Sequence, residues 1–248
     1  MQPTRGRHMA GLRIFETDPD ARPAPRASFA DDVVGRFRSG RMVGRRPESL
    51  NEWRITTGDP VVAARVAELF GGEPTEWDTD AEDSTEILTE AASVSIIIDS
   101  ADALTSDMRL YGSVGSEPIH WCDGVEFLDD EQKGQPCGCP ALLVDRKLLA
   151  KSGKGPKPNL GIKFRLADDP DLGIFRARFG AWDLAKVWHE ILQALDDVGG
   201  PARARLSLET VEFTIKTGPK KGTQVAYNKP VIKVLGAYSA PEALPAAA

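Results

Sequence analysis

The residues with the clearest capacity for chemistry form one cluster near the middle of the 248-residue chain. All three cysteines lie within eighteen residues, and a histidine precedes them: His120, Cys122, Cys137 and Cys139. Zinc prefers four nitrogen or sulfur ligands in a tetrahedron, and this set supplies four. Because four protein ligands leave no open coordination position, such an ion would stabilise the fold rather than catalyse a reaction. The sequence therefore predicts a structural zinc ion.

The backbone around these residues fits such a site. If the segment before Cys122 is extended, His120 and Cys122 project to the same face, because side chains alternate along a strand. Gly138 lets the chain turn tightly between the second pair of cysteines, and Pro140 fixes the direction in which it leaves. Asp123 is an alternative to His120 as the fourth ligand. The competing interpretation is three small buried cysteines beside a solvated histidine.

The acidic segment between the two cysteine pairs is a second candidate for metal chemistry. Five carboxylates there could hold a divalent cation and serve a metal-dependent enzyme: Asp123, Glu126, Asp129, Asp130 and Glu131. A solvated charged loop explains the same composition more simply. The chain contains no phosphate-binding loop, dinucleotide-binding glycine motif, serine nucleophile elbow or zinc-protease motif. We therefore assign no catalytic residue and expect a binding protein, not an enzyme.

Charge is distributed unevenly along the chain, whose net charge is −6. Segment 73–107 carries eleven acidic residues and no basic one, whereas segment 146–165 carries seven basic residues and no acidic one. Such segregation suits a basic surface that meets an acidic partner. The side chains expected to contact that partner are Lys147, Lys151, Lys154 and Lys157. Five arginines interleaved with glycines at 36–46 could contact phosphates, although an exposed hairpin or loop is the simpler interpretation.

Composition indicates a cytoplasmic protein. Hydrophobic content is 41% and charged content 27%, as in ordinary globular proteins. The longest apolar run, 94–98, is far too short to cross a bilayer, so we expect no contact with a membrane. The basic N-terminus lacks the apolar core of a secretory signal, and an odd number of clustered cysteines indicates a reducing compartment.

Hydrophobic periodicity predicts an α+β fold of antiparallel strands with two or three helices and a small zinc-binding loop. The expected strands span 12–14, 51–57, 87–88, 94–98, 108–111, 162–166, 173–179, 206–215 and 224–234. The expected helices span 60–70, 142–150 and 182–197. Segment 152–158 is expected to be a flexible basic loop, and Trp77 an apolar plug in the core.

Two helices carry particularly clear signals. Asp59 is placed to cap the first helix, Pro60 occupies its first position, and Gly71 ends it. In the helix 182–197 an apolar stripe predicts the buried face: Ala185, Trp188, Ile191, Leu192 and Leu195. His189 lies off this stripe, so we expect a solvated side chain rather than a metal ligand.

The domain organisation follows from these elements. A second methionine at position 9 is a natural start, so residues 1–9 are interpreted as a leader or a cloning remnant. The remaining segments are an N-terminal α+β part at 10–114, a zinc-binding loop region at 115–145, a C-terminal α+β part at 146–238 and a flexible tail at 239–248.

Several stretches together resemble one protein family. They are GLRIFETDP near the start, SLNEWRITTGDP running into LFGGEPTEW, CDGVEFLDDEQKGQPCGCP, and KPVIKVLGAY near the end. The chain resembles, from about residue 10 to 238, the recombination directionality factors of actinobacterial phages that use large serine integrases. An abundance of arginine over lysine, 19 against 12, fits a GC-rich source.

The resemblance implies an accessory protein without catalytic residues of its own. Directionality factors bind the integrase, which carries the nucleophilic serine, and switch site-specific recombination from integration to prophage excision. They are thought to act chiefly through protein contacts, with little sequence-specific DNA binding. Two other classes stay open: a phage DNA-metabolism protein that binds nucleic acid through its basic segments, and a metal-dependent enzyme built on the acidic loop.

Overall fold

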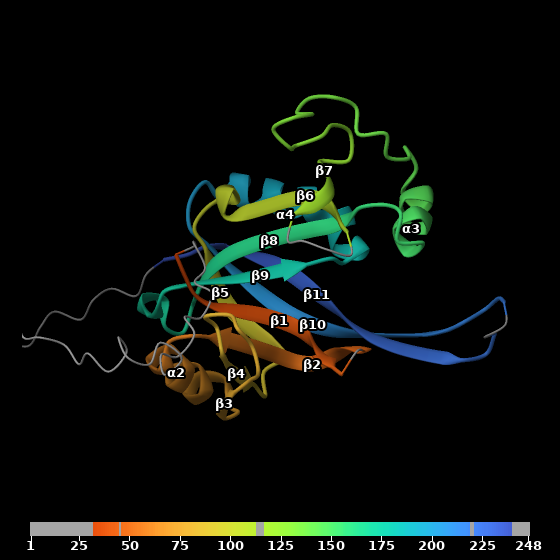
Figure 1. The fold of residues 1–248 in the computed structure, drawn as a ribbon. Helices are drawn as coiled ribbons and strands as arrows, with labels where there is room; N and C mark the ends of the chain where they lie inside the picture. The colour runs from red at the N-terminus through yellow and green to blue at the C-terminus, as the bar shows by residue number, and fades with distance from the viewer. Residues whose placement is uncertain (1–31, 45, 113–116, 219–220, 240–248) are drawn as a thin grey trace, which may run out of the picture.

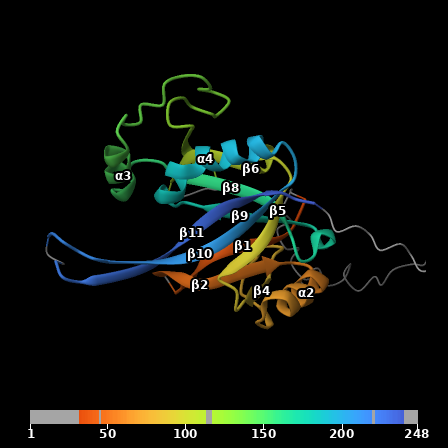
Figure 2. The same cartoon turned by 180° about the vertical axis from the view of Figure 1, so that it is seen from behind.

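A computed structural model describes residues 32–44, 46–112, 117–218 and 221–239, and Figures 1 and 2 show it from opposite sides. Eleven strands form one sheet, and three α-helices lie against it or at its margins. The strands are β1 (Val33–Val43), β2 (Arg46–Thr57), β3 (Pro74–Glu76), β4 (Thr85–Leu88), β5 (Ser93–Ile98), β6 (Leu104–Tyr111), β7 (Pro118–Cys122), β8 (Lys157–Leu166), β9 (Ile174–Phe179), β10 (Ala202–Thr214) and β11 (Gln224–Ala237). The helices are α2 (Pro60–Phe70), α3 (Leu143–Lys151) and α4 (Trp182–Val198), with 3-10 turns η2 (Ala101–Ala103) and η3 (Pro170–Leu172). The predicted α+β class is confirmed.

The sheet forks at β8. Its main path runs β11-β10-β5-β8-β9-β1-β2-β4-β3, and β6 and β7 branch off from β8. The first half of β8 pairs with β6, placing Lys157 opposite Arg109, whereas its end pairs with β5. All pairs are antiparallel except β1 with β9, which run parallel. Strands from both sides of the cysteine segment therefore interleave in one sheet.

Two helices follow their sequence signals. In α2 the Asp59 carboxylate accepts a hydrogen bond of 2.8 Å from the Val61 amide, and Pro60 occupies the first turn. The predicted stripe of α4 turns inward: Trp188, Ile191 and Leu195 are buried, together with Leu184. His189 is exposed, as expected.

The core is continuous across the sheet and rich in aromatic rings. The Phe37 ring of β1 meets Trp53 of β2 and Phe164 of β8 edge to face, at centroid distances of 5.7 and 5.2 Å. Phe175 of β9 packs on the same Phe37 ring at 5.7 Å. These contacts join strands that are distant in sequence, and edge-to-face pairs add about 0.5–1.5 kcal/mol each to the gain from burial.

Some expectations need correction. The arginine- and glycine-rich stretch forms a hairpin, but its first part, β1, lies inside the sheet between β9 and β2. Trp77 is only half-buried: its indole N–H donates to the Asp83 carbonyl at 2.7 Å, and the Arg54 guanidinium lies 4.4 Å from its ring. The predicted basic loop is shorter than expected, because Lys157 already belongs to β8. The strand expected at 12–14, residues 1–9 and nearly all of segment 239–248 lie outside the described residues.

Candidate metal centre

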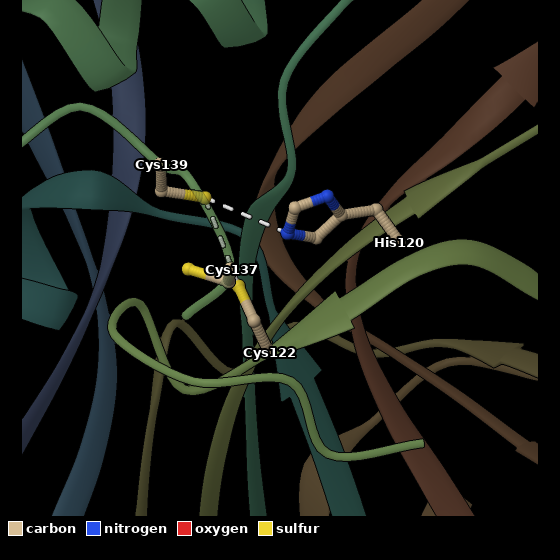
Figure 3. A group of neighbouring side chains, drawn as sticks. All are labelled: His120, Cys122, Cys137 and Cys139. Carbon is tan, nitrogen blue, oxygen red and sulfur yellow. Dashed lines mark hydrogen bonds between the residues drawn. The ribbon is translucent and has the colours of Figure 1, made fainter. Parts of the chain in front are cut away.

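The four predicted ligands converge although they lie on two separate segments (Figure 3). One nitrogen or sulfur atom from each of His120, Cys122, Cys137 and Cys139 lies within 4.8 Å of all the others. The Sγ atoms of Cys122 and Cys139 are 3.8 Å apart, and the Cys139 Sγ lies 3.5 Å from the His120 Nε2. This set could hold a metal ion.

Local backbone structure explains the convergence. β7 is extended, so His120 and Cys122 share a face, as their spacing predicts. The chain then reverses, and the Cys137 amide donates to the carbonyl of Val125, three residues after Cys122, at 2.8 Å. Gly138, between the last two cysteines, has a φ of +69°, a left-handed conformation that glycine adopts without strain.

Asp123 stabilises the turn after Cys122. Its carboxylate accepts the amides of Val125 at 2.7 Å and Glu126 at 2.8 Å, which fixes the reversal after Cys122. Those two backbone hydrogen bonds hold the pKa of Asp123 below its usual range, the one from Glu126 contributing most. Asp123 is not among the clustered ligand atoms, so the structure favours His120 over it as the fourth ligand.

Burial dominates the electrostatics of the cluster. It raises the pKa of the Cys122 thiol to about 12 and raises the pKa of Cys139 as well, because thiolates are poorly solvated there. Burial also lowers the pKa of His120, which favours the neutral ring that binds metals. A divalent cation would provide the positive charge that buried thiolates lack.

Arg146 of α3 ties the two ligand segments together. Its guanidinium donates to the Gly124 carbonyl at 2.7 Å and to the Pro140 carbonyl at 2.5 Å. Gly124 lies two residues after Cys122, and Pro140 directly follows Cys139. The sequence reading placed Arg146 only at the start of a basic run, so it missed this supporting role.

The acidic loop forms no second cation site. Among the described residues, the histidine–cysteine cluster is the one group of three or more ligand-type side chains that could hold a metal. Asp129 instead accepts the Gln132 amide at 2.9 Å, an ordinary turn-capping bond. The loop carboxylates therefore serve local turns or face solvent.

Comparison with known families assigns the chain to one of them. The family described as "Gp3-like: Recombination directionality factor-like" matches residues 34–235, most of the chain and all four ligands of the cluster. The protein belongs to this family. No solved structure matches the chain. The match confirms the resemblance read from the sequence motifs.

In this family member the four predicted contact lysines lie on different elements. Lys147 and Lys151 belong to α3, Lys154 to the turn after it, and Lys157 opens β8. All are exposed except Lys147, which is half-buried. Among the described residues no helix is long and apolar enough to cross a bilayer.

A second basic feature lies on β1, β2 and β9. A concavity of about 1090 Å³ there is lined by guanidinium groups from three strands: Arg36, Arg38, Arg41, Arg54, Arg176 and Arg178. Acidic partners offset several of them, since Arg38 pairs with buried Asp83 at 2.7 Å and Arg54 with Glu86 at 2.5 Å. Burial and, to a smaller extent, repulsion from Arg176 lower the pKa of Arg178.

Proposed function

We propose that the protein is a recombination directionality factor that binds a large serine integrase directly and favours excision over integration. The observation that carries the proposal is the family match over residues 34–235. In this role the protein supplies a binding surface, while the integrase supplies the chemistry of strand exchange. The proposed site of action is the cytoplasm, where the integrase meets its DNA.

The energetic requirement is modest. An accessory protein redirects a reaction by binding one integrase–DNA assembly more tightly than another. A difference of about 1–3 kcal/mol in binding free energy changes relative affinity by roughly 5–150-fold. Surface contacts can provide that difference without any catalytic group.

We propose that the metal is zinc and that it is structural. Two sulfurs each about 2.3 Å from a tetrahedral zinc ion lie about 3.8 Å apart, and a sulfur–nitrogen pair about 3.6 Å apart. Two of the six distances in the cluster match these values, 3.8 Å between Cys122 and Cys139 and 3.5 Å between Cys139 and His120, and all pairs lie within 4.8 Å. The three thiolates and one imidazole would fill the coordination sphere, so zinc would hold the loop in place.

Four lysines between residues 147 and 157 are the proposed first contact with the integrase. Lys147, Lys151, Lys154 and Lys157 come from one short stretch that contains no acidic residue. Like-charged side chains that project together attract an acidic surface and speed association.

A second candidate function is nucleic-acid binding, which the arginine-lined concavity favours. Arginine forms bidentate hydrogen bonds with phosphate, and a phosphate-binding face gives a steep dependence of affinity on salt. Directly paired carboxylates on Glu48, Asp83 and Glu86 reduce the net charge there, which makes this function the weaker of the two.

An in-vitro recombination assay tests the proposal. The integrase is incubated with each pair of attachment sites, with and without this protein, and products are quantified. We expect excision to rise and integration to fall when the protein is present. If wild-type protein neither co-purifies with the integrase nor alters either product ratio, the proposal is wrong. Salt-titrated binding to single- and double-stranded DNA then tests the second candidate.

A further inference from the structure

The outer half of the β10–β11 hairpin extends beyond the rest of the sheet, as Figures 1 and 2 show from opposite sides. β10 pairs with β11 along its whole length but with β5 only from Ala202 to Ser207. Residues 209–214 and 224–229 therefore form a two-stranded ribbon, and no third strand among the described residues pairs with it. A two-stranded ribbon alone is marginally stable in water, and further strands that share an apolar face stabilise it.

The ribbon carries a row of apolar side chains on one face. Val211 pairs opposite Tyr227 and Phe213 opposite Val225, so these four side chains share a face, and Ile215 continues the row. The Phe213 and Tyr227 rings meet edge to face at a centroid distance of 6.3 Å, yet remain 47% and 39% exposed. An exposed apolar face on a projecting pair of strands is suited to association with another protein chain.

One edge of the ribbon offers backbone groups for pairing. The Leu208 amide donates to the Ala92 carbonyl at 2.8 Å, on the β5 side of β10. Because backbone groups alternate in direction along a strand, three later residues point their N–H and C=O groups to this same side: Thr210, Glu212 and Thr214. Ile215 keeps the alternation, because its amide donates in the other direction, to the Thr223 carbonyl at 3.0 Å. Within the described part of the chain no strand pairs with this edge.

The base of the ribbon is fixed on the body of the protein. The Asn228 side-chain amide donates to the Leu50 carbonyl at 2.9 Å and to the Asn51 Oδ1 at 2.8 Å, and both acceptors belong to β2. From the opposite strand the Thr210 hydroxyl donates to the Asn228 Oδ1 at 2.7 Å. A ribbon anchored in this way loses little entropy when another strand pairs with its edge.

The side-chain pattern of this edge complements a second copy of itself. Antiparallel pairing of one strand with its own copy is two-fold symmetric, so every pair occurs twice. If the pairing is centred on Thr214, Glu212 lies opposite Lys216 of the second copy, and Phe213 lies opposite Ile215. Opposite charges and aromatic–β-branched pairs both stabilise adjacent strands, and Glu212 and Lys216 are both exposed. Pairing centred on Glu212 instead would place two carboxylates face to face.

We propose that the protein forms a two-fold dimer in which the β10 edges of two ribbons pair antiparallel, centred on Thr214. The four strands then form one continuous ribbon, and the apolar rows of both copies share one of its faces. The two bodies lie at opposite ends of the joined ribbons, because the paired strands run in opposite directions. The inference goes beyond the proposed function and does not depend on it, since assembly is measured on the protein alone.

Exchange of the paired charges tests this interface. The variants are Glu212→Lys, Lys216→Glu and the double exchange Glu212→Lys/Lys216→Glu. The control is Glu52→Lys, which makes the same charge change at an exposed position of β2. Sedimentation equilibrium over a dilution series gives the dimer dissociation constant, and circular dichroism with thermal unfolding checks that each variant is folded.

We expect wild type to dimerise and each single variant to raise the dimer dissociation constant about tenfold or more, because two opposite-charge pairs become two like-charge pairs. The double exchange should restore dimerisation, since it recreates both opposite-charge pairs. An equimolar mixture of the two single variants should form a mixed dimer for the same reason. Glu52→Lys should stay within about twofold of wild type.

Two results would overturn the proposal: wild type that remains monomeric across the dilution series, or a dimer whose affinity is unchanged in both single variants. If a single variant unfolds, the double exchange still decides, because it keeps both charges and must dimerise. If monomeric wild type binds the integrase and the single variants lose that binding, the edge serves the integrase and the dimer is wrong. The lysines proposed to contact the integrase lie on other elements, so loss of the dimer should leave integrase association per chain unchanged.

Discussion

The Arg146 guanidinium and the Gly124 carbonyl oxygen lie 2.7 Å apart, although twenty-two residues separate them in sequence. With its second hydrogen bond, to the Pro140 carbonyl, Arg146 holds both ends of the loop 123–140 against α3. The helix and the ligand segments thus form one unit, and disturbance of either should be felt in both.

Replacing Arg146 tests that unit. Arg146→Met keeps much of the length of the side chain but removes both hydrogen bonds to carbonyls. We expect a loss of about 1.5–3 kcal/mol in the free energy of unfolding, and faster transfer of metal to a chromogenic chelator. Arg41→Met is the control, because Arg41 pairs with exposed Glu48 and should lose less than about 1 kcal/mol. Equal losses in both variants would show that Arg146 does not support the loop.

Metal content tests the ligand set. Protein purified without added metal or chelator should contain about one zinc per chain by elemental analysis. Cys122→Ser should lose the metal, whereas Asp123→Asn should keep it, since Asp123 caps a turn. Less than about a tenth of an equivalent in wild type, with Cys122→Ser as stable as wild type, would rule out the zinc site. Metal loss from Asp123→Asn alone would restore Asp123 as a ligand.

The affinity of the site for zinc should depend steeply on pH. The raised thiol pKa values of Cys122 and Cys139 mean that both are protonated near neutral pH, so each releases a proton when metal binds. The pKa of His120 is lowered, so its ring is already neutral. We expect apparent affinity to rise at least about a hundredfold per pH unit between about pH 7 and 8, as measured by competition with a chelator of known affinity. An affinity that is flat across this range would contradict thiolate coordination.

The orientation of α4 can be tested by two neighbouring residues. Trp188 is buried on its inner face, so Trp188→Ala should cost about 3–5 kcal/mol of unfolding free energy in denaturant titration. His189 is exposed, and His189→Ala should cost less than about 0.5 kcal/mol. Comparable large losses at both positions would mean that His189 has a structural or ligand role.

Charge reversal tests the lysine contact with the integrase. The triple variant Lys151→Glu, Lys154→Glu and Lys157→Glu should slow association with the integrase and reduce its salt dependence, without unfolding the protein. A matched control reverses three exposed lysines of the β10–β11 hairpin: Lys216, Lys221 and Lys233. Unchanged excision and binding in the first triple variant would remove these lysines from the contact.

Local signals in the sequence predicted much of this fold. Asp59 and Pro60 set the start of α2, the stripe through Trp188 set the buried face of α4, and alternation placed the long β10–β11 hairpin. The cysteine cluster could be predicted equally well, because His120 and Cys122, and likewise Cys137 and Cys139, are close neighbours in sequence. The helix signals and each cysteine pair depend on residues close together in the sequence, and the hairpin joins two strands that follow one another directly along the chain.

Contacts between elements that are distant in sequence could not be predicted from such local signals. Nothing in the periodicity of β1 indicates that Arg36 lies beside Arg176 of β9, so the arginine-lined concavity could not be foreseen. Arg146 likewise belongs, by sequence, to a run of basic residues, and only the tertiary fold turns it toward Gly124. Such contacts depend on how whole elements pack.

The parallel pairing of β1 with β9 also constrains how the chain can mature on the ribosome. Phe37 of β1 pairs opposite Ala177 of β9, so one edge of β1 stays open until β9 has been synthesised. Until then Phe37 lacks the rings of Phe164 and Phe175 that pack against it in the folded protein. Folding should therefore be slow, as expected for a topology dominated by distant contacts. A nascent or truncated chain that ends before β9 would expose an unpaired strand edge to aggregation.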